Sequence, residues 1–452
     1  MRTGVINIKS FINAGFRFDP DIHLSEGSVV RNELKHLPYQ LSTVGENASD
    51  VFLGNIFTRV FVQKPDHGVP YLAAKETVLS NIETGRFLSK KQASQLSYLI
   101  LKKDWILVTC SGTLGNVVYT NNNYENHIAT HDLIRIVPNS KRVNKGTLYA
   151  FLSGRYGYYQ ITQSQFGGVV KHINAEQTKS IIVPVFPDEF QREVDDLIQE
   201  SAHLREEAAA FLGQAHQIIE NRIKLNQERK PSQVSISSIL KSHDLRFEAA
   251  YYTSENRSIY DFITSTFKYN KLGNLTLNIF RPGIFKREYV SNGVMFLGGS
   301  DILRTIPKSD KKLSFRQVAR MPELKVEKGW ILVTCGGTIG NTVLIDKQLE
   351  KCAISQHVMR IVPNDKILKG YLYAFLSSNI GKELITMFST GSVIPQIEAP
   401  HLELVPIPIF EKELMIQIDK LVENYVSRIE TSKEYETKAI AMVEEEIEKW
   451  NQ

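Results

Sequence analysis

The chain contains an internal repeat, and this repeat constrains its fold more than any other feature. Residues 105–116 have the sequence WILVTCSGTLGN and residues 330–341 have the sequence WILVTCGGTIGN, so ten of twelve positions are identical at an offset of 225. Two further segments recur in the same order: RIVPN at 135–139 and 360–364, and LYAFLS at 148–153 and 372–377. Self-similarity on this scale predicts two copies of one domain.

The two copies are more weakly related outside this middle block. Three upstream anchors pair Arg17-Phe18-Asp19 with Arg246-Phe247-Glu248, Asn55-Ile56-Phe57 with Asn278-Ile279-Phe280, and Tyr71-Leu72 with Phe296-Leu297. Downstream, the apolar and proline-containing segment at 182–186 returns at 406–410. Each copy is therefore expected to consist of a variable front, a nearly identical middle and a helical tail.

The middle block has the pattern of β structure. Trp105–Thr109 and Val117–Tyr119 are β-prone runs separated by the glycine-rich turn Ser111–Gly115, which predicts a hairpin. Ile134–Val137 is expected to form another strand that Pro138 ends, and a helix is expected to begin within Leu148–Leu152. The predicted fold class is α+β, with two repeated domains of mixed α/β structure.

Each tail carries the apolar spacing of a long helix. After Pro187, residues at alternating spacings of four and three form a coiled-coil seam: Phe190, Val194, Leu197, Ser201, Leu204, Ala208, Phe211, Ala215, Ile218, Arg222 and Leu225. Pro231 is expected to end this helix. The second tail opens with Leu414, Ile418, Leu421 and Tyr425 and shifts phase to Ala439, Val443 and Trp450. Each seam can pack on its own domain, or the two tails can pair in antiparallel fashion; the length of the stripe favours the antiparallel pair.

Composition places the chain among globular proteins. Of its 452 residues 42% are hydrophobic and 23% are charged, and the net charge of +5 permits an anionic partner without requiring one. The three cysteines, Cys110, Cys335 and Cys352, form no CxxC pair, which disfavours a disulfide framework or a zinc cluster. The sequence shows neither a signal-peptide pattern nor a run of 18 apolar residues, so a cytoplasmic location is expected.

The sequence offers no motif for catalysis. GxxxxGK[ST], HExxH, GxSxG and a GxGxxG at a strand-to-helix junction are all missing. The turns Ser111–Gly115 and Gly336–Gly340 suit either a phosphate or a tight hairpin, and the hairpin is the simpler reading because no lysine follows. Cys110 and Cys335 would need a base such as His127, His131 or His357 to act as nucleophiles. We expect both thiols, and also Trp105 and Trp330, to be core residues.

Two motif blocks together carry a family resemblance. The first is ILVTCSGTLGN with its twin ILVTCGGTIGN; the second places Gly167-Gly168 before Val169, and Gly391 before Ser392–Ile397, upstream of a proline-containing strand and the long helix. With the Arg-Phe-Asp/Glu openings at Arg17 and Arg246, the chain resembles the specificity subunit of type I restriction-modification systems. The resemblance implies four parts with a pseudo-twofold relation: target-recognition domain 1 at 1–186, conserved spacer helix 1 at 187–230, target-recognition domain 2 at 231–409 and conserved spacer helix 2 at 410–452.

The resemblance also implies partners. Such a subunit binds double-stranded DNA, two modification subunits that carry out S-adenosylmethionine chemistry, and restriction subunits that hydrolyse ATP. No cofactor and no catalysis are expected of this chain itself. The family often has a Glu-Gln pair where each helix begins, whereas this chain has Glu189-Phe190-Gln191-Arg192 and Glu413-Leu414-Met415-Ile416-Gln417. This departure concerns the details of partner docking.

The variable fronts supply the candidate DNA contacts, since phosphate binding requires basic side chains. The candidates are Arg59, Lys64, Lys75, Lys90 and Lys91 in the first front, and Arg281, Lys286, Arg287, Arg304, Lys311, Lys312 and Arg316 in the second. Lys64 is expected to lie opposite Lys286 or Arg287. A competing hypothesis is a two-lobed coiled-coil adaptor that binds proteins and has no DNA role. A standalone enzyme is disfavoured, because the residues that both copies share are mostly apolar, Gly, Thr and Pro.

Overall fold

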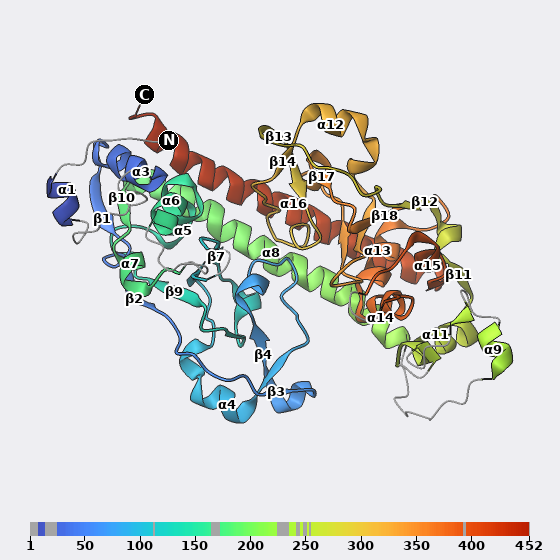
Figure 1. Ribbon diagram of the computed structural model, residues 1–452. Helices are drawn as coiled ribbons and strands as arrows, with labels where there is room; N and C mark the ends of the chain where they lie inside the picture. The colour runs from blue at the N-terminus through green and yellow to red at the C-terminus, as the bar shows by residue number, and fades with distance from the viewer. Residues whose placement is uncertain are drawn as a thin grey trace. The chain divides into compact units, whose positions relative to one another are not determined.

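The chain divides into two compact units, each with one copy of the repeat. The first unit comprises Met1–Glu206 and Thr431–Gln452, and the second comprises Glu207–Glu430. The computed structural model describes residues 8–13, 25–111, 114–163, 172–223, 235–240, 245–246, 251–252, 255–391 and 395–451. Figure 1 shows the path of the chain through these elements. The boundaries at 206 and 430 fall inside the two long helices, so the predicted four-part division stays a prediction.

The first unit is built on two four-stranded sheets and one two-stranded ribbon. The first sheet has the order β2 (Ala48–Phe52), β9 (Leu133–Pro138), β6 (Ile106–Thr109) and β7 (Val117–Tyr119). The second has the order β3 (Phe61–Val62), β5 (Phe87–Ser89), β4 (Gly68–Leu72) and β8 (Ile128–Ala129). The ribbon pairs β1 (Gln40–Thr43) with β10 (Ile182–Val185).

The second unit repeats this arrangement. Its four-stranded sheet has the order β12 (Thr276–Phe280), β18 (Val358–Pro363), β15 (Ile331–Thr334) and β16 (Thr342–Leu344). A three-stranded sheet contains β14 (Lys312–Leu313), β13 (Tyr289–Leu297) and β17 (Ala353–Ile354), and the ribbon pairs β11 (Tyr269–Lys271) with β19 (Pro406–Pro408). The strand order of the main sheet is therefore the same in both copies.

The helices also recur in the same order. In the first unit these are α3 (Glu26–Lys35), α4 (Lys90–Gln95), α5 (Lys145–Ser153), α6 (Arg155–Gln163) and α7 (Ala175–Lys179). In the second they are α11 (Glu255–Thr266), α12 (Phe315–Arg320), α13 (Lys369–Ser377), α14 (Asn379–Met387) and α15 (Ala399–Glu403). The long tails are α8 (Asp188–Arg222) and α16 (Lys412–Glu448), and two short helices are α1 (Ile8–Asn13) and α9 (Ile236–Leu240).

These elements confirm the local predictions for the middle block. β6 and β7 form the expected antiparallel hairpin, with Ile106 opposite Tyr119. β9 is the strand expected at Ile134–Val137, and α5 contains the helix expected from Leu148. Trp105 is buried and packs edge-on against Phe52, with ring centroids 5.9 Å apart. Trp330 makes the same contact with Phe280. Trp105 is thus a core residue, as expected, whereas Trp330 is only partly buried and packs against the edge of its core.

One buried arginine in each unit connects a strand of the main sheet to the chain segment that precedes that strand. The guanidinium group of Arg135 donates hydrogen bonds to the carbonyls of Leu133, Ala129 and Thr130 at 2.9–3.1 Å. Arg360 donates in the same way to Val358, Ser355 and Ile354. Burial lowers the pKa of each arginine to about 10, which keeps both charged at neutral pH. The arginine of the repeated RIVPN segment therefore has a structural role in both copies, since its guanidinium group donates hydrogen bonds to three backbone carbonyls.

The two long helices pack on their own domains and on each other in antiparallel fashion. In the first unit, Ser201 of α8 donates a hydrogen bond to the Ser432 carbonyl of α16, and Val194 packs in one core with Ala439 and Val443. In the second unit, Glu207 of α8 forms a salt bridge with Arg428 of α16. The sequence left open whether each tail packs on its own domain or on the other tail, and both contacts are present. Each helix can make both because its buried stripe is wider than the narrow seam of a coiled coil.

The seam positions differ in part from the predicted heptads. Ile198 and Ile219 are buried, whereas their predicted neighbours Leu197 and Ile218 are only partly so. The prediction for Trp450 was wrong: its side chain is 45% exposed, and Ile447 fills the core position one turn after Val443. Trp450 lies beyond the end of α16 and packs against Tyr39 instead.

Several sequence predictions lie outside the described residues. These are the opening Arg17-Phe18-Asp19, the pair Gly167-Gly168 with Val169, the segment Ser392–Ile394, the helix-ending Pro231 and the seam residue Leu225. The partner opening at Arg246 is described only for that residue: its guanidinium group donates hydrogen bonds to the carbonyls of Met387 and Ser389. A structural role for Arg246 is therefore established.

Candidate nucleic-acid interface

Each long helix holds its own domain through two acidic side chains. Asp195 and Glu206 of α8 are eleven residues apart, which is about three helical turns, so they lie on one face. A carboxylate oxygen of Asp195 accepts a hydrogen bond from the Gly146 amide at 2.5 Å. In the second copy Asp419 of α16 accepts the equivalent hydrogen bond from Gly370 at 2.7 Å. The sequence analysis missed this acidic pair, although its spacing repeats.

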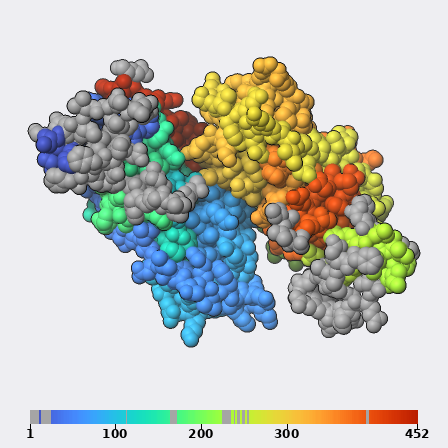
Figure 2. Space-filling model, in the orientation of Figure 1, coloured from blue at the N-terminus to red at the C-terminus, as the bar shows by residue number. Residues whose placement is uncertain are grey.

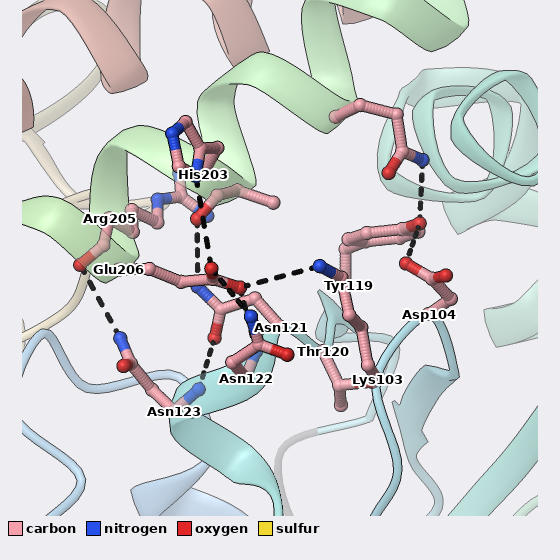
Figure 3. A network of polar contacts seen from close by, with 12 residues as sticks. Lys103, Asp104, Tyr119, Thr120, Asn121, Asn122, Asn123, His203, Arg205 and Glu206 are labelled. Atoms are coloured by element: carbon pink, nitrogen blue, oxygen red, sulfur yellow. Dashed lines mark hydrogen bonds and ion pairs between the residues drawn. The ribbon is translucent and has the colours of Figure 1, made fainter.

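Glu206 fixes the turn after β7 to α8. Its carboxylate accepts hydrogen bonds from the Asn122 amide at 2.7 Å and from the Asn122 side chain at 2.8 Å, and Lys103 lies 4.0 Å away. Figure 3 shows Asn121, Asn122 and Asn123 gathered along this turn of the helix, with Asn123 directed at the carbonyl of Arg205. The same figure shows Tyr119 donating to Asp104, which lies beside the first hairpin strand.

The second copy repeats the contact with different side chains. Glu430 of α16 forms a salt bridge with Lys328 at 2.8 Å and accepts a hydrogen bond from the Lys347 amide at 3.2 Å. Lys328 and Lys347 occupy the positions of Lys103 and Asn122 at the offset of 225. In each unit the domain is thus fixed to its helix through the conserved middle, and the variable front takes no part in these contacts.

The structure places most of the twelve candidate DNA contacts on the surface. Exposed candidates are Arg59, Lys64, Lys75, Lys90, Lys91, Lys286, Arg287, Lys311 and Arg316, and partly buried ones are Arg281, Arg304 and Lys312. In the first unit α4 and β3 lie away from α8, and the blue residues of this region form the outer end of that unit (Figures 1 and 2). The front is therefore accessible to a large ligand.

One of the partly buried arginines, Arg281, has an internal role. Arg281 forms a salt bridge with Glu398 at 2.5 Å and donates a hydrogen bond to the Gln356 carbonyl at 3.3 Å. The hydrogen bond to Glu398 raises the pKa of Arg281, and the pair lines a cavity of about 520 Å³ that also contains Cys335. Burial lowers the pKa of Arg304. The charge of Arg281 is already compensated, which makes it a poorer phosphate ligand than its exposed neighbours.

Strand register corrects the alignment of the two fronts. Phe52 lies opposite Arg135 in β9, and Phe280 lies opposite Arg360 in β18, so Phe52 and not Phe57 corresponds to Phe280. The pairing of Asn55-Ile56-Phe57 with Asn278-Ile279-Phe280 was wrong. The pairing of Tyr71 with Phe296 is confirmed, because the two residues lie opposite Ile128 and Ala353 in equivalent parallel pairs.

The corrected offset of 228 brings two short motifs into register. Ile56-Phe57-Thr58-Arg59 has the sequence IFTR and residues 284–287 have the sequence IFKR. We call these the Ile-Phe-x-Arg loops; each follows the first strand of the main sheet of its unit. Arg59 is therefore the counterpart of Arg287, and the expected pairing of Lys64 with that region was wrong by five residues.

The arginine of each loop stacks on two aromatic rings. The guanidinium carbon of Arg59 lies 5.8 Å from the ring centroids of both Phe57 and Tyr71. That of Arg287 lies 5.9 Å from Phe285 and 5.7 Å from Phe296. Such stacking is worth about 0.5–1 kcal/mol at exposed sites and orients the guanidinium plane. The aromatic shell is thus a repeated feature of both variable fronts.

The hydrogen-bond partners of the two arginines are neutral. Arg59 donates to the Tyr71 hydroxyl at 2.6 Å and to the Thr130 hydroxyl at 3.1 Å. Arg287 donates to the side-chain oxygen of Gln356 at 3.3 Å. Within the described residues neither arginine takes part in a salt bridge. By contrast, Arg86, which also stacks on Tyr71, is paired with Glu76.

A glutamine holds the backbone on both sides of each arginine. Gln92 of α4 accepts a hydrogen bond from the Val60 amide at 2.9 Å and donates one to the Thr58 carbonyl. Gln317 of α12 accepts from the Glu288 amide at 2.9 Å and donates to the Lys286 carbonyl at 2.7 Å. Ser89 and Ser314 cap the two helices three residues earlier. The repeated Ser-x-x-Gln spacing is a signal from which sequence reasoning could have found this contact.

Cys110 and Cys335, which occupy equivalent positions in the two copies, are core residues. Cys110 and Cys335 are 5% and 3% exposed, and burial raises the pKa of their thiols to about 12 and about 11. The Cys335 thiol donates a weak hydrogen bond to the Gln356 carbonyl at 3.8 Å. A thiol with so high a pKa is protonated at neutral pH and is a poor nucleophile.

Among the described residues, no cluster of three or more His, Cys, Asp or Glu side chains is arranged to hold a metal ion. No helix within the described ranges is long and apolar enough to cross a membrane.

Comparison with known proteins identifies two matching segments. Residues 50–199 and 260–438 match the family described as type I restriction modification DNA specificity domain. A crystal structure of a type I restriction-modification S subunit from M. genitalium is 12% identical, with a TM-score of 0.37 over 92% of this chain and 96% of that chain. The HsdS subunit from Thermoanaerobacter tengcongensis is 12% identical, with a TM-score of 0.29 over 91% and 97%. No curated protein matches the chain.

Proposed function

Since the chain belongs to the family of type I restriction-modification DNA specificity domains, it is a DNA sequence-specificity component, and we propose that its two copies recognise the two halves of one bipartite target. The observation that carries this proposal is that each matched segment lies mainly in a different compact unit. The middle block is nearly identical in both copies, whereas the fronts differ. Two different fronts on one scaffold suit an asymmetric target.

The partners follow from the same membership. We propose that the chain binds two modification subunits and the restriction subunits of its system, and that these partners carry out methyl transfer and ATP hydrolysis. The chain itself serves without catalysis and without a cofactor. We propose the cytoplasm as its place of action. The buried, protonated thiols of Cys110 and Cys335 support the proposal, because they remove the two repeated residues that could have acted as nucleophiles.

An exchange of fronts tests the proposal. Residues 53–100 contain the first Ile-Phe-x-Arg loop and α4 but none of the residues that contact Asp195 or Glu206. Replacement of this segment by that of a related specificity subunit is expected to change one half of the methylated sequence and to leave the other half unaltered. The matched exchange of residues 281–325 is expected to change the other half. Methylome sequencing of cells that express each chimera with its modification subunits provides the measurement.

The adaptor hypothesis makes the opposite prediction. A protein-binding adaptor without a DNA role would be eluted from heparin and from duplex DNA at low salt, and neither exchange would alter a methylation pattern. Loss of both target halves from a folded chimera that still binds its modification subunits would contradict independent recognition by the two copies. Binding of the modification subunits is checked by size-exclusion chromatography of the assembled complex.

A further inference from the structure

We propose that Arg59 and Arg287 are equivalent phosphate contacts that anchor the two recognition domains to the DNA backbone in a sequence-independent way. The inference rests on the proposed DNA-recognition function and deepens it. It assigns a shared contact to two fronts that otherwise differ, and it separates residues that position the protein from residues that select bases.

The first step concerns charge. Arg59 and Arg287 are exposed residues, and the hydrogen-bond partners of their guanidinium groups are the neutral side chains of Tyr71, Thr130 and Gln356. Among the described residues neither guanidinium group is paired with a carboxylate, and each keeps spare N–H donors, since a guanidinium group has five. A phosphate oxygen is negatively charged and accepts hydrogen bonds, so it suits both the charge and the free donors. A binding partner with an apolar surface would satisfy neither.

The second step concerns rigidity. The aromatic rings orient the guanidinium plane, and Gln92 and Gln317 fix the backbone before and after each arginine. An ordered side chain loses less conformational entropy when it binds, so this shell increases the affinity of each contact. A flexible surface arginine with no binding role does not need such a shell, and here the shell is built twice.

The third step concerns the surroundings of the loops. Ile56 and Ile284 are 86% and 93% exposed at equivalent positions, beside the two arginines. The helix that supplies each glutamine also presents an exposed basic residue, Lys91 in α4 and Arg316 in α12, one residue before that glutamine. Each loop, together with the helix that supplies its glutamine, thus combines at least two positive charges with an exposed apolar side chain. This combination suits the phosphates and sugars of a DNA backbone.

The fourth step decides between phosphate and base contact. The two fronts are expected to recognise different half-sites, so a residue that recognised a base in both would impose the same base on both halves. Both copies make this contact with the same surrounding residues, so the group that they contact is expected to be one that every half-site contains. The phosphate group of the DNA backbone meets this condition. Base selection then falls to residues of the fronts that differ between the copies.

The test uses the chain assembled with its modification subunits. Binding to a fluorescent duplex that carries the methylated target is measured between low and moderate NaCl concentrations, together with duplexes substituted in either half. Arg59→Gln and Arg287→Gln are each expected to weaken binding to all duplexes equally. Each is expected to lower the slope of log K against log salt by about 0.9, and the double variant by about twice that amount. Arg59→Lys is expected to retain the slope, since lysine still carries the charge.

Two controls separate charge from other effects. The double variant Glu76→Gln/Arg86→Gln removes the ion pair between Glu76 and Arg86, whose guanidinium group stacks on the same Tyr71 ring. The net charge does not change, so the slope is expected to stay unchanged. Ile56→Ser is expected to reduce affinity without changing the slope, because it alters apolar contact only. Circular dichroism melting confirms that each variant is folded.

Three outcomes would overturn the proposal. An unchanged slope in both arginine variants would show that neither arginine contacts a phosphate. Relaxed discrimination at one base pair would show that the arginine recognises a base. Loss of modification subunits with intact DNA binding would show that the loops are a protein-binding surface. In all three cases the unmutated complex still prefers its target; a wild-type complex with no sequence preference would instead refute the proposed function.

Discussion

Arg205 of α8 forms a salt bridge with Glu436 of α16, which lies 231 residues further along the chain. The Glu436 carboxylate is 5% exposed and also accepts a hydrogen bond from the Tyr149 hydroxyl at 2.6 Å. Within the first unit this pair joins both long helices to α5. A buried charge is stable only when it is paired, so the three side chains determine each other's position.

We predict that Glu436→Ala lowers the free energy of unfolding by about 3–5 kcal/mol, because it leaves the charge of Arg205 without its partner. Lys438→Ala is the matched control on the same helix. Lys438 and Glu193 form an exposed pair at 3.8 Å, and its loss is expected to cost less than about 0.5 kcal/mol. Urea unfolding followed by circular dichroism provides both values. Equal effects of the two substitutions would contradict a structural role for the buried pair.

We predict that stability falls in acid because of His216. Burial lowers the pKa of His216 to about 4, and its Nε2 atom lies 2.9 Å from the Ser377 hydroxyl in the second unit. The unfolded chain binds a proton near pH 6.5, whereas the folded chain does not until about pH 4. The contribution of neutral His216 to the free energy of unfolding is therefore complete above about pH 6.5 and is lost as the pH falls toward 4.

His216→Gln removes this titration and is expected to flatten the stability profile between about pH 6.5 and 4. His36→Gln changes an exposed histidine outside α8 and is expected to keep the wild-type profile. Urea midpoints at three pH values in this window are sufficient for the comparison. A His216→Gln profile that still falls as steeply as the wild type would place the acid sensitivity elsewhere.

We predict that Gln317→Leu destabilises the second Ile-Phe-x-Arg loop. The substitution removes the partner of the Glu288 amide and of the Lys286 carbonyl, at a cost of about 0.5–1.5 kcal/mol, because both groups belong to exposed residues that water can reach. Gln317→Glu still accepts from the Glu288 amide, so a smaller loss is expected. Amide hydrogen exchange at Glu288 measures the effect locally. Unchanged protection of that amide in Gln317→Leu would show that the glutamine does not hold the loop.

We predict that iodoacetamide does not modify Cys110 or Cys335 in the folded chain at pH 8. Their raised pKa values leave almost no thiolate, and their burial excludes the reagent. In guanidinium chloride all three cysteines are expected to react. Mass spectrometry of the two samples makes the comparison. Rapid modification of either thiol in the native sample would reopen a chemical role for it.

Local patterns determined much of the fold. The run Ile106–Thr109, its glycine-rich turn and Val117–Tyr119 predicted the β6–β7 hairpin, because alternation and turn residues act over a few positions. The apolar spacing predicted α8 and α16 to within a few residues of their described ends, since a helix repeats every 3.6 residues. The repeat itself predicted two domains of one kind, and the family match covers both.

Only the tertiary structure decided which distant residues meet. The sequence paired Phe57 with Phe280, whereas strand register pairs Phe52 with it and thereby makes Arg59 the counterpart of Arg287. Trp450 fitted the heptad pattern but lies beyond the helix end, where its ring packs edge-on against Tyr39 and stays 45% exposed. The hydrogen bonds of Asp195 and Gln317 join residues 49 and 31 positions apart. Periodicity reports which face of an element is buried, but the partner of that face depends on how sheets and helices pack, and packing is a property of the folded chain alone.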